Sequence, residues 1–181
     1  PGPQNPARTR PNPDAPFAMI RSPEFETTLQ DTHALALPDA VVRPFVEKDM
    51  RRVVVCARFE GKSVRYHAAL QKRHGAFYIM FNRKNQKSLG VFPNDYFTVR
   101  LEEDQTEFGV DLPPELEEVF RQDTDAFKKF RQLSPGACRS VIYWVLGVAS
   151  PQRRIERSLT VSRRLHQGAK TASDLVKGKP D

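Results

Sequence analysis

The sequence predicts an α+β protein in which a small antiparallel β-barrel precedes a short C-terminal block of helices. From Phe25 to Val110 the hydrophobic residues mostly alternate with a period of two, whereas from Leu112 to Gly168 they recur at intervals of three and four. A chain of 181 residues is long enough for one domain with an appendage. We therefore divide the chain into residues 1–24, 25–111, 112–168 and 169–181.

The first segment, residues 1–24, contains seven of the fifteen prolines and few residues that could enter a core. We expect this leader to be disordered. The stretch from Arg21 to Phe25 resembles a translated cloning site, so part of the leader is expected to derive from an expression vector.

Short alternating runs predict the strands of the barrel. The runs Val53–Phe59 and Val64–Leu70 flank Glu60–Gly61–Lys62, which predicts a hairpin turn. Three further runs, Phe25–Leu29, Phe77–Phe81 and Phe97–Leu101, are separated by turn residues. Because no helical pattern interrupts them, we expect all the strands to close into one antiparallel barrel.

The longest polar connection within this region runs from Asn82 to Gly90 and carries three cations, Arg83, Lys84 and Lys87. Loops held by a rigid scaffold often carry function, which makes these cations candidate binding residues. A solvated surface turn is the alternative interpretation, since such turns are also rich in Lys and Arg.

Two helices of the last third begin with the same signal, a serine that can cap followed by proline, at Ser134–Pro135 and Ser150–Pro151. The first helix shows a stripe of apolar residues typical of one buried face. The stripe consists of Cys138, Val141, Ile142, Val145 and Ala149. We expect the helices to pack on the barrel without a large core of their own, because the helical block is small.

The second of these helices is expected to have an apolar face containing Ile155 and Leu159 and a cationic face containing Arg153, Arg157 and Arg164. Residues 134–181 contain nine Lys/Arg and three Asp/Glu, which places +6 of the net charge of +7 in this segment. This asymmetry predicts an anionic partner for the helix and for the flexible basic tail, residues 169–181. A solvated cationic surface is the alternative.

Residues that could carry chemistry are sparse. Cys56 and Cys138 lie in apolar stretches, which is typical of buried thiols in a reducing compartment, so we expect a cytoplasmic protein. The four histidines are widely separated, and no metal site, cofactor or catalytic group is predicted. No apolar run is long enough to span a membrane.

Several of these segments together resemble a bacterial domain-of-unknown-function family that adopts a double-split β-barrel, followed by the bacteriocin-protection or YdeI/OmpD-associated module. The first resemblance depends on Glu60–Leu70, Gly75–Ile79, Lys87–Gly90, Asn94–Val99 and Leu112–Pro113. The second depends on Pro114–Leu116, Ala126–Phe127, Phe130, Leu133–Pro135 and Ile142–Val145. Together they cover residues 25–168 and imply the fold rather than a reaction.

The sequence departs from the family pattern after Trp144. The family usually has a small residue, a lysine and then a Thr–Arg pair, whereas this chain reads Gly147–Ile155 without that lysine. Arg153 or Arg154 can correspond to the arginine of the family's Thr–Arg pair.

Three functional hypotheses follow. The first is a non-enzymatic bacterial cytoplasmic protein of the bacteriocin-protection type that acts by binding an anionic or protein partner. The second is a nucleic-acid-binding or regulatory module that uses the basic C-terminal helix. The third is an enzyme or small-ligand binder at the junction of barrel and helices. The sequence does not decide the oligomeric state: one chain could close the barrel alone, or two chains could exchange hairpins to form a dimer.

Overall fold

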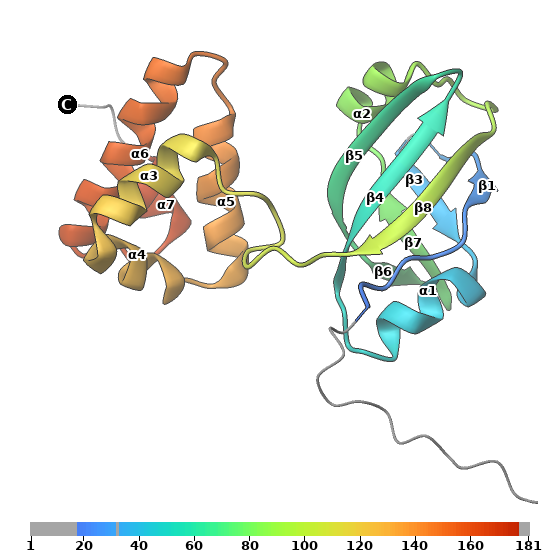
Figure 1. Cartoon of the computed structure of the whole chain (residues 1–181), viewed down its shortest axis with the longest axis horizontal. Helices are drawn as coiled ribbons and strands as arrows, with labels where there is room; N and C mark the ends of the chain where they lie inside the picture. Colours follow the sequence, from blue (N-terminus) through green and yellow to red (C-terminus); the bar gives the residue numbers. More distant parts are fainter. Residues whose placement is uncertain (1–17, 32, 178–181) are drawn as a thin grey trace, which may run out of the picture. The chain divides into compact units, whose positions relative to one another are not determined.

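The computed structural model describes residues 18–31 and 33–177. The chain forms two compact units, the first ending at Glu103 and the second beginning at Asp104. The first unit is a β-rich fold and the second is wholly helical within the described residues (Figure 1). The expected α+β class is therefore confirmed, although the division falls earlier than residue 111.

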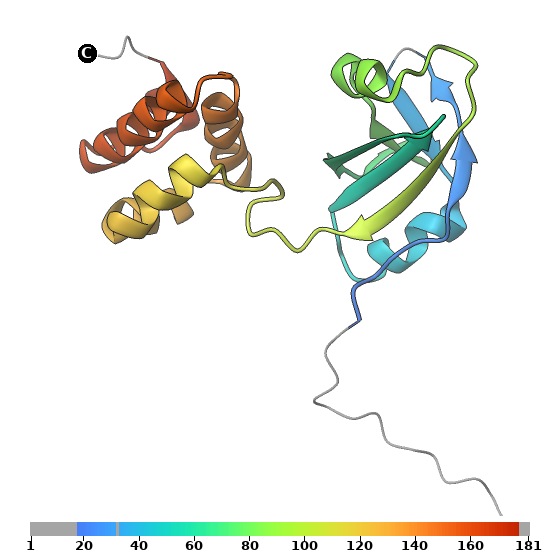
Figure 2. The same cartoon turned by 45° about the horizontal axis from the view of Figure 1, so that its top comes forward.

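The first unit contains two four-stranded antiparallel sheets (Figure 2). One has the order β1 (Phe25–Thr27), β8 (Phe97–Glu103), β4 (Arg52–Phe59) and β5 (Lys62–Ala69). The other has the order β2 (Leu29–Gln30), β3 (Ala34–Leu37), β7 (Ala76–Met80) and β6 (Gln71–Arg73). The chain changes from one sheet to the other four times, at the single residues Thr28 and Leu70 and across the longer segments 38–51 and 81–96.

The described strands do not close into the single hydrogen-bonded barrel expected from the sequence, because they pair within two separate sheets and the chain passes between these sheets without continuous pairing. Side chains connect the sheets instead: Tyr66 Oη donates to Met80 O at 3.0 Å, and Thr27 Oγ1 donates to Ala36 O at 3.5 Å. One hydrophobic core lies between the sheets, and Phe81 stacks there on Phe97 with ring centroids 5.4 Å apart.

Two-residue turns set the register of the hairpins. Glu60 and Gly61 both have positive φ and connect Phe59 with its partner Lys62, which confirms the predicted hairpin. His74 and Gly75 adopt the same left-handed backbone between β6 and β7.

Two helices interrupt the strands, which contradicts the expectation of strands alone. α1 (Asp39–Val46) contains Pro44, which obscures its pattern, but it buries Val41, Val42 and Phe45 in the core. α2 (Arg83–Leu89) lies where a polar loop was expected. Only one residue of α2, Leu89, is buried, so the segment shows no apolar periodicity.

The second unit consists of five described helices: α3 (Pro114–Gln122), α4 (Thr124–Arg131), α5 (Pro135–Leu146), α6 (Pro151–His166) and α7 (Ala172–Val176). The oxygens of Ser134 and Ser150 accept hydrogen bonds from Ala137 N and Arg153 N, so both predicted N-caps are confirmed. The predicted stripe of α5 is buried, except for Ala149, which lies beyond the helix and is exposed.

The helices enclose a hydrophobic core of their own. It includes Leu116, Phe130, Ile142, Val161 and Leu175, each with no exposed surface. The expectation that the helical block lacks a separate core is therefore wrong, because each of the described helices contributes buried residues to a shared core.

Both ends of the described chain are more structured than the sequence suggested. Ser22 N donates to Leu101 O and Arg21 pairs with Glu102, so the part of the leader after residue 17 continues the edge of the first sheet. At the other end, Thr171 and Asp174 form a capping box for α7, which buries Leu175. The remainder of the leader, residues 1–17, and the tail after Lys177 lie outside the described residues.

Candidate functional site

Two of the three arginines expected on the cationic face of α6 are engaged by backbone carbonyls. Arg157 Nη1 donates to Trp144 O, and its guanidinium carbon lies 4.7 Å from the centroid of the Trp144 ring. Arg164 Nη1 donates to Leu175 O at 2.8 Å. These carbonyls belong to the last turns of α5 and α7, where few helical donors remain, although Trp144 O also accepts from the N–H of Gly147 at 3.3 Å. Arg157 and Arg164 are half-buried, whereas Arg153 is exposed.

The buried face of α6 is not the apolar face that contains Ile155 and Leu159. Ile155 and Leu159 are 39% and 55% exposed, respectively. The buried stripe contains Ser158, Val161 and Leu165, because the small Ser158 allows close approach to the core while Val161 and Leu165 fill it. The apolar face predicted from Ile155 and Leu159 therefore lies at the surface of the unit rather than in its core.

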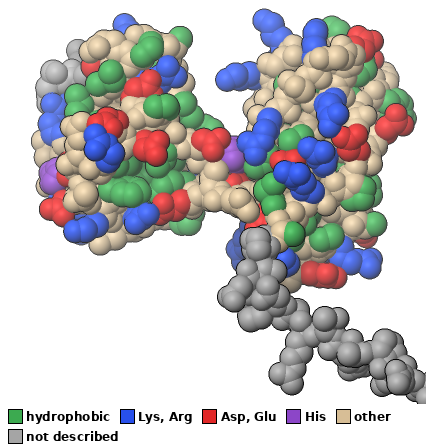
Figure 3. All heavy atoms as spheres, viewed as in Figure 1, with side chains coloured by type: hydrophobic (Ala, Val, Ile, Leu, Met, Phe, Trp, Pro, Cys, Tyr) green, Lys and Arg blue, Asp and Glu red, His purple; other side chains and the backbone are tan. Residues whose placement is uncertain are grey.

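The exposed apolar residues of α6 line a groove against α3. The groove has a volume of about 530 Å³. Its lining residues are Pro114, Glu115, Glu118, Val119 and Gln122 of α3 with Pro151, Ile155 and Leu159 of α6. Hydrophobic side chains gather on this face of the second unit (Figure 3).

An ion pair connects the two walls of this groove. Arg154 Nε lies 3.0 Å from Glu115 Oε1, and both side chains are mostly buried. Glu118 is held by Arg121 within α3, with Arg121 Nε donating to Glu118 Oε2 at 2.7 Å. The groove therefore combines apolar side chains with two carboxylates, each of which pairs with an arginine.

The second set of predicted cations, Arg83, Lys84 and Lys87, lies on α2 of the first unit, and all three side chains are exposed. Asn82 Oδ1 accepts from Asn85 N and Gly90 adopts a left-handed conformation, so both ends of this short helix are capped. The structure thus presents these cations on a helix rather than on a loop.

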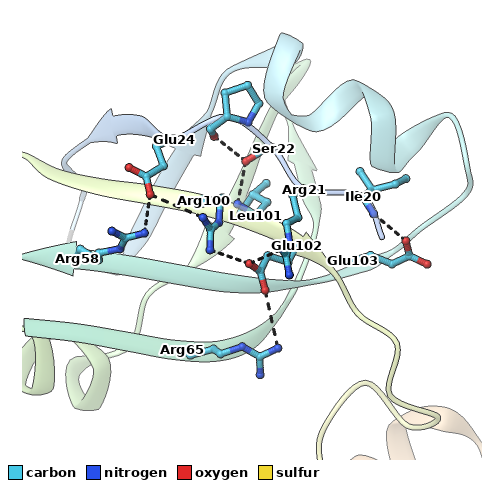
Figure 4. Close-up of polar contacts among 11 residues, drawn as sticks. Ile20, Arg21, Ser22, Glu24, Arg58, Arg65, Arg100, Leu101, Glu102 and Glu103 are labelled. Atoms are coloured by element: carbon cyan, nitrogen blue, oxygen red, sulfur yellow. Dashed lines mark hydrogen bonds and ion pairs between the residues drawn. The ribbon is translucent and has the colours of Figure 1, made fainter. Parts of the chain in front are cut away.

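A cluster of charges that the sequence did not suggest lies on the outer face of β4, β5 and β8 (Figure 4). Glu102 is only 6% exposed. Arg100 Nη2 donates to Glu102 Oε1 at 2.9 Å, while Arg21 Nε and Arg65 Nη2 lie 3.6 and 4.0 Å from its oxygens. Three cations thereby offset the cost of burying one carboxylate.

The same cluster holds the segment before β1 against β8. Arg58 Nη2 donates to Glu24 Oε1 at 2.6 Å, and Arg100 Nη1 lies 3.9 Å from the same oxygen. Blue and red side chains intermingle on this face in Figure 3. Because each carboxylate is shared by arginines, we assign the cluster a structural role.

Cys56 lies between two of these arginines in the strand register, opposite Arg65 on one side and Arg100 on the other. Burial and the nearby Glu102 raise the pKa of the Cys56 thiol, although Arg65 and Arg100 oppose the change. Burial also raises the pKa of Cys138. Both free thiols are protonated near neutral pH, which disfavours a nucleophilic role.

A serine, an aspartate and a histidine meet on the surface of the second unit. Asp123 Oδ2 accepts from Ser162 Oγ at 2.5 Å and lies 2.8 Å from His166 Nε2, while Asp123 Oδ1 caps α4 at Ala126 N. The hydrogen bond from Ser162, followed by the backbone one from Ala126, lowers the pKa of Asp123 to about 2. Ser162 and His166 both contact the carboxylate, so the histidine is not placed to activate the serine.

Among the described residues, no group of three or more His, Cys, Asp or Glu side chains is arranged to hold a metal ion. The described helices include none that combines the length and apolar character needed to cross a membrane.

Fold and surface together define a two-unit α+β protein whose helical unit carries an apolar groove. Residues 109–168 match the family described as bacteriocin-protection, YdeI or OmpD-associated. This match confirms the resemblance that the sequence suggested for the helical segment. Neither a curated protein nor a solved structure matches the chain.

Proposed function

We propose that this chain is a non-enzymatic, bacterial cytoplasmic binding protein of the YdeI/OmpD-associated type, and that the groove between α3 and α6 receives an apolar segment of a partner protein. One observation carries the proposal. Every lining residue of the groove lies between Pro114 and Leu159, inside the segment that matches the family. Exposed apolar surface of this kind is typical of interaction sites.

The charges around the groove support a partner segment that is both apolar and cationic. Glu115 and Glu118 are the charged residues among those that line it, and both are acidic. An amphipathic helix could place leucine-like side chains against Ile155 and Leu159 and its basic residues near the carboxylates. Each carboxylate already pairs with an arginine, Glu115 with Arg154 and Glu118 with Arg121, so a basic residue of the partner would share a paired carboxylate rather than neutralise a free one.

Binding of a labelled synthetic amphipathic peptide of leucine and lysine, followed by fluorescence anisotropy, tests the groove. We expect Ile155→Ser and Leu159→Ser each to weaken binding about ten-fold, since each removes a buried anchor from the interface. A peptide in which glutamate replaces lysine should bind more weakly to the wild-type protein than the lysine peptide does.

Leu146→Ser is the matched control, because Leu146 is exposed on α5 of the same unit but does not line the groove. If the Leu146 variant loses as much affinity as the Leu159 variant, or if neither peptide binds, the groove is not the binding surface.

Three further expectations from the sequence remain: the type of barrel, the cellular compartment and the alternative functions. We propose that the two sheets of the first unit form the expected double-split barrel, which the crossings at Thr28 and Leu70 support. The free Cys56 and Cys138 support a reducing compartment. Nucleic-acid binding through Arg153, Arg157 and Arg164 of the basic helix, with Arg83, Lys84 and Lys87 as a second contact, stays a prediction, as does a small-ligand or enzymatic role.

A further inference from the structure

We propose that the end of the first unit formed by α2 and the following turn binds single-stranded nucleic acid, with two aromatic rings stacking on bases and the α2 cations contacting phosphates. The residues concerned are Lys62, Arg83, Lys84, Lys87, Phe92 and Tyr96, which we call the aromatic–cationic end. This proposal concerns the first unit and does not depend on the groove between α3 and α6.

The rings of Phe92 and Tyr96 are 72% and 68% exposed, more than any other large hydrophobic side chain of the described chain. The turn that carries them is held in one shape. Asp95 Oδ2 accepts from Phe92 N at 2.8 Å, Asp95 N donates to Phe92 O at 3.2 Å, and Asn94 adopts a positive φ. Rings presented on a fixed turn lose little conformational freedom when a ligand stacks on them.

Cations lie at the same end of the unit as this turn. α2 packs against β5, and the turn follows directly after its C-cap, Gly90 (Figures 1 and 2). A Cβ atom at Gly90 would lie only 2.9 Å from Lys62 Nζ, so the Lys62 side chain lies over the junction of helix and turn. No ion pair engages Arg83, Lys84 or Lys87 within the described residues.

Exposed aromatic rings at the same end as cations without ion pairs suit single-stranded nucleic acid better than a duplex or a membrane surface. Bases of a single strand present open faces to aromatic side chains, and its phosphates are accessible to Lys and Arg. A duplex keeps its bases stacked, so the two rings would have no role. In a membrane-inserting turn the tip would be apolar, whereas Pro93, Asn94 and Asp95 stand between these rings and include a carboxylate.

The test uses the full chain and labelled oligo(dT) and oligo(rU) of about 12 nucleotides, within the usual site size, with anisotropy measured at about 50 and 200 mM salt. Phe92→Ala and Tyr96→Ala should each weaken binding about five-fold or more without changing the salt dependence. Replacing Arg83, Lys84 and Lys87 with alanine should lower the slope of log affinity against log salt by about 2, because each phosphate contact with a single strand contributes about 0.7.

Two sets of controls accompany these variants. Replacing Arg43, Lys48 and Arg73 with alanine removes the same charge from exposed positions on α1, the turn after it and β6, and it should leave affinity and slope close to the wild-type values. Phe92→Tyr and Tyr96→Phe keep a ring and should retain binding, which separates stacking from any effect on the fold.

Several results would overturn the proposal. They are undetectable binding at the lower salt, wild-type affinity in both alanine variants of the rings, equal loss in the control triple variant, or a duplex bound as tightly as the single strand. Binding to phosphatidylserine vesicles that depends on Phe92, without binding to either oligonucleotide, would assign this end to a lipid surface instead.

Discussion

At the scale of single residues, several arginines that contribute to the net positive charge make contacts within the fold. Arg157 and Arg164 close the ends of α5 and α7, and Arg100 supports the buried Glu102. An arginine fork satisfies carbonyls or carboxylates at fixed geometry. The count of cations therefore overstates how many are available to a partner.

Asp123 gives a pH dependence that can be measured. Its pKa is lowered from 3.8 to about 2 in the folded chain, chiefly by the hydrogen bond from Ser162. A carboxyl with a depressed folded pKa stabilises the fold above its unfolded pKa, and the contribution is lost as the pH falls through the folded pKa. We therefore expect the melting temperature to fall between about pH 4 and pH 2 less steeply in Asp123→Asn than in the wild type.

Asparagine caps helices as well as aspartate does, so this substitution retains the cap of α4 while removing the titration. Asp125→Asn removes a charge from the first turn of the same helix and serves as the control. An unchanged pH profile in the Asp123 variant would contradict the assigned role of this carboxylate.

At the scale of helices, the faces of α5 and α6 give a matched comparison. Ile142 is fully buried on α5, whereas Ile155 is partly exposed on α6. We expect Ile142→Ala to cost about 2–5 kcal/mol of unfolding free energy, and Ile155→Ala and Arg153→Ala to cost much less, since Arg153 is exposed and Ile155 is partly exposed. Urea unfolding followed by Trp144 fluorescence measures this, because Trp144 is the single tryptophan and lies in the second unit.

Similar losses in the two isoleucine variants would mean that α6 packs with its Ile155 face inward. This comparison also decides whether the groove is open, because Ile155 cannot line it and fill the core at once.

At the scale of the whole molecule, two separate hydrophobic cores indicate two units of folding. The second core is built entirely from residues after Glu103. We expect a fragment of residues 104–181 to unfold cooperatively with heat, with a Trp144 fluorescence transition like that of the full chain. A gradual, non-cooperative change in the fragment would show that the helices depend on the first unit.

Much of the local structure was predictable from the sequence because its signals are local. The serine caps at Ser134 and Ser150, the Glu60–Gly61 turn and the stripe of α5 each depend on residues a few positions apart. The helical segment was also recognisable from its sequence, and its family match confirms that resemblance. The two short helices of the first unit were not predictable from the sequence. Pro44 within α1 is unusual for a helix, and α2 buries only Leu89, so it has no apolar stripe.

The candidate site depended on tertiary structure. Sequence alone determined the α+β class, the capped helices and the concentration of cations toward the C-terminus. Only the packed chain decided that Arg157 and Arg164 bind carbonyls, that Ile155 and Leu159 are exposed, and that strands change sheets at Thr28 and Leu70. The physical reason is that an amphipathic pattern fixes the spacing of a face, whereas the volume available in the core decides which face is buried.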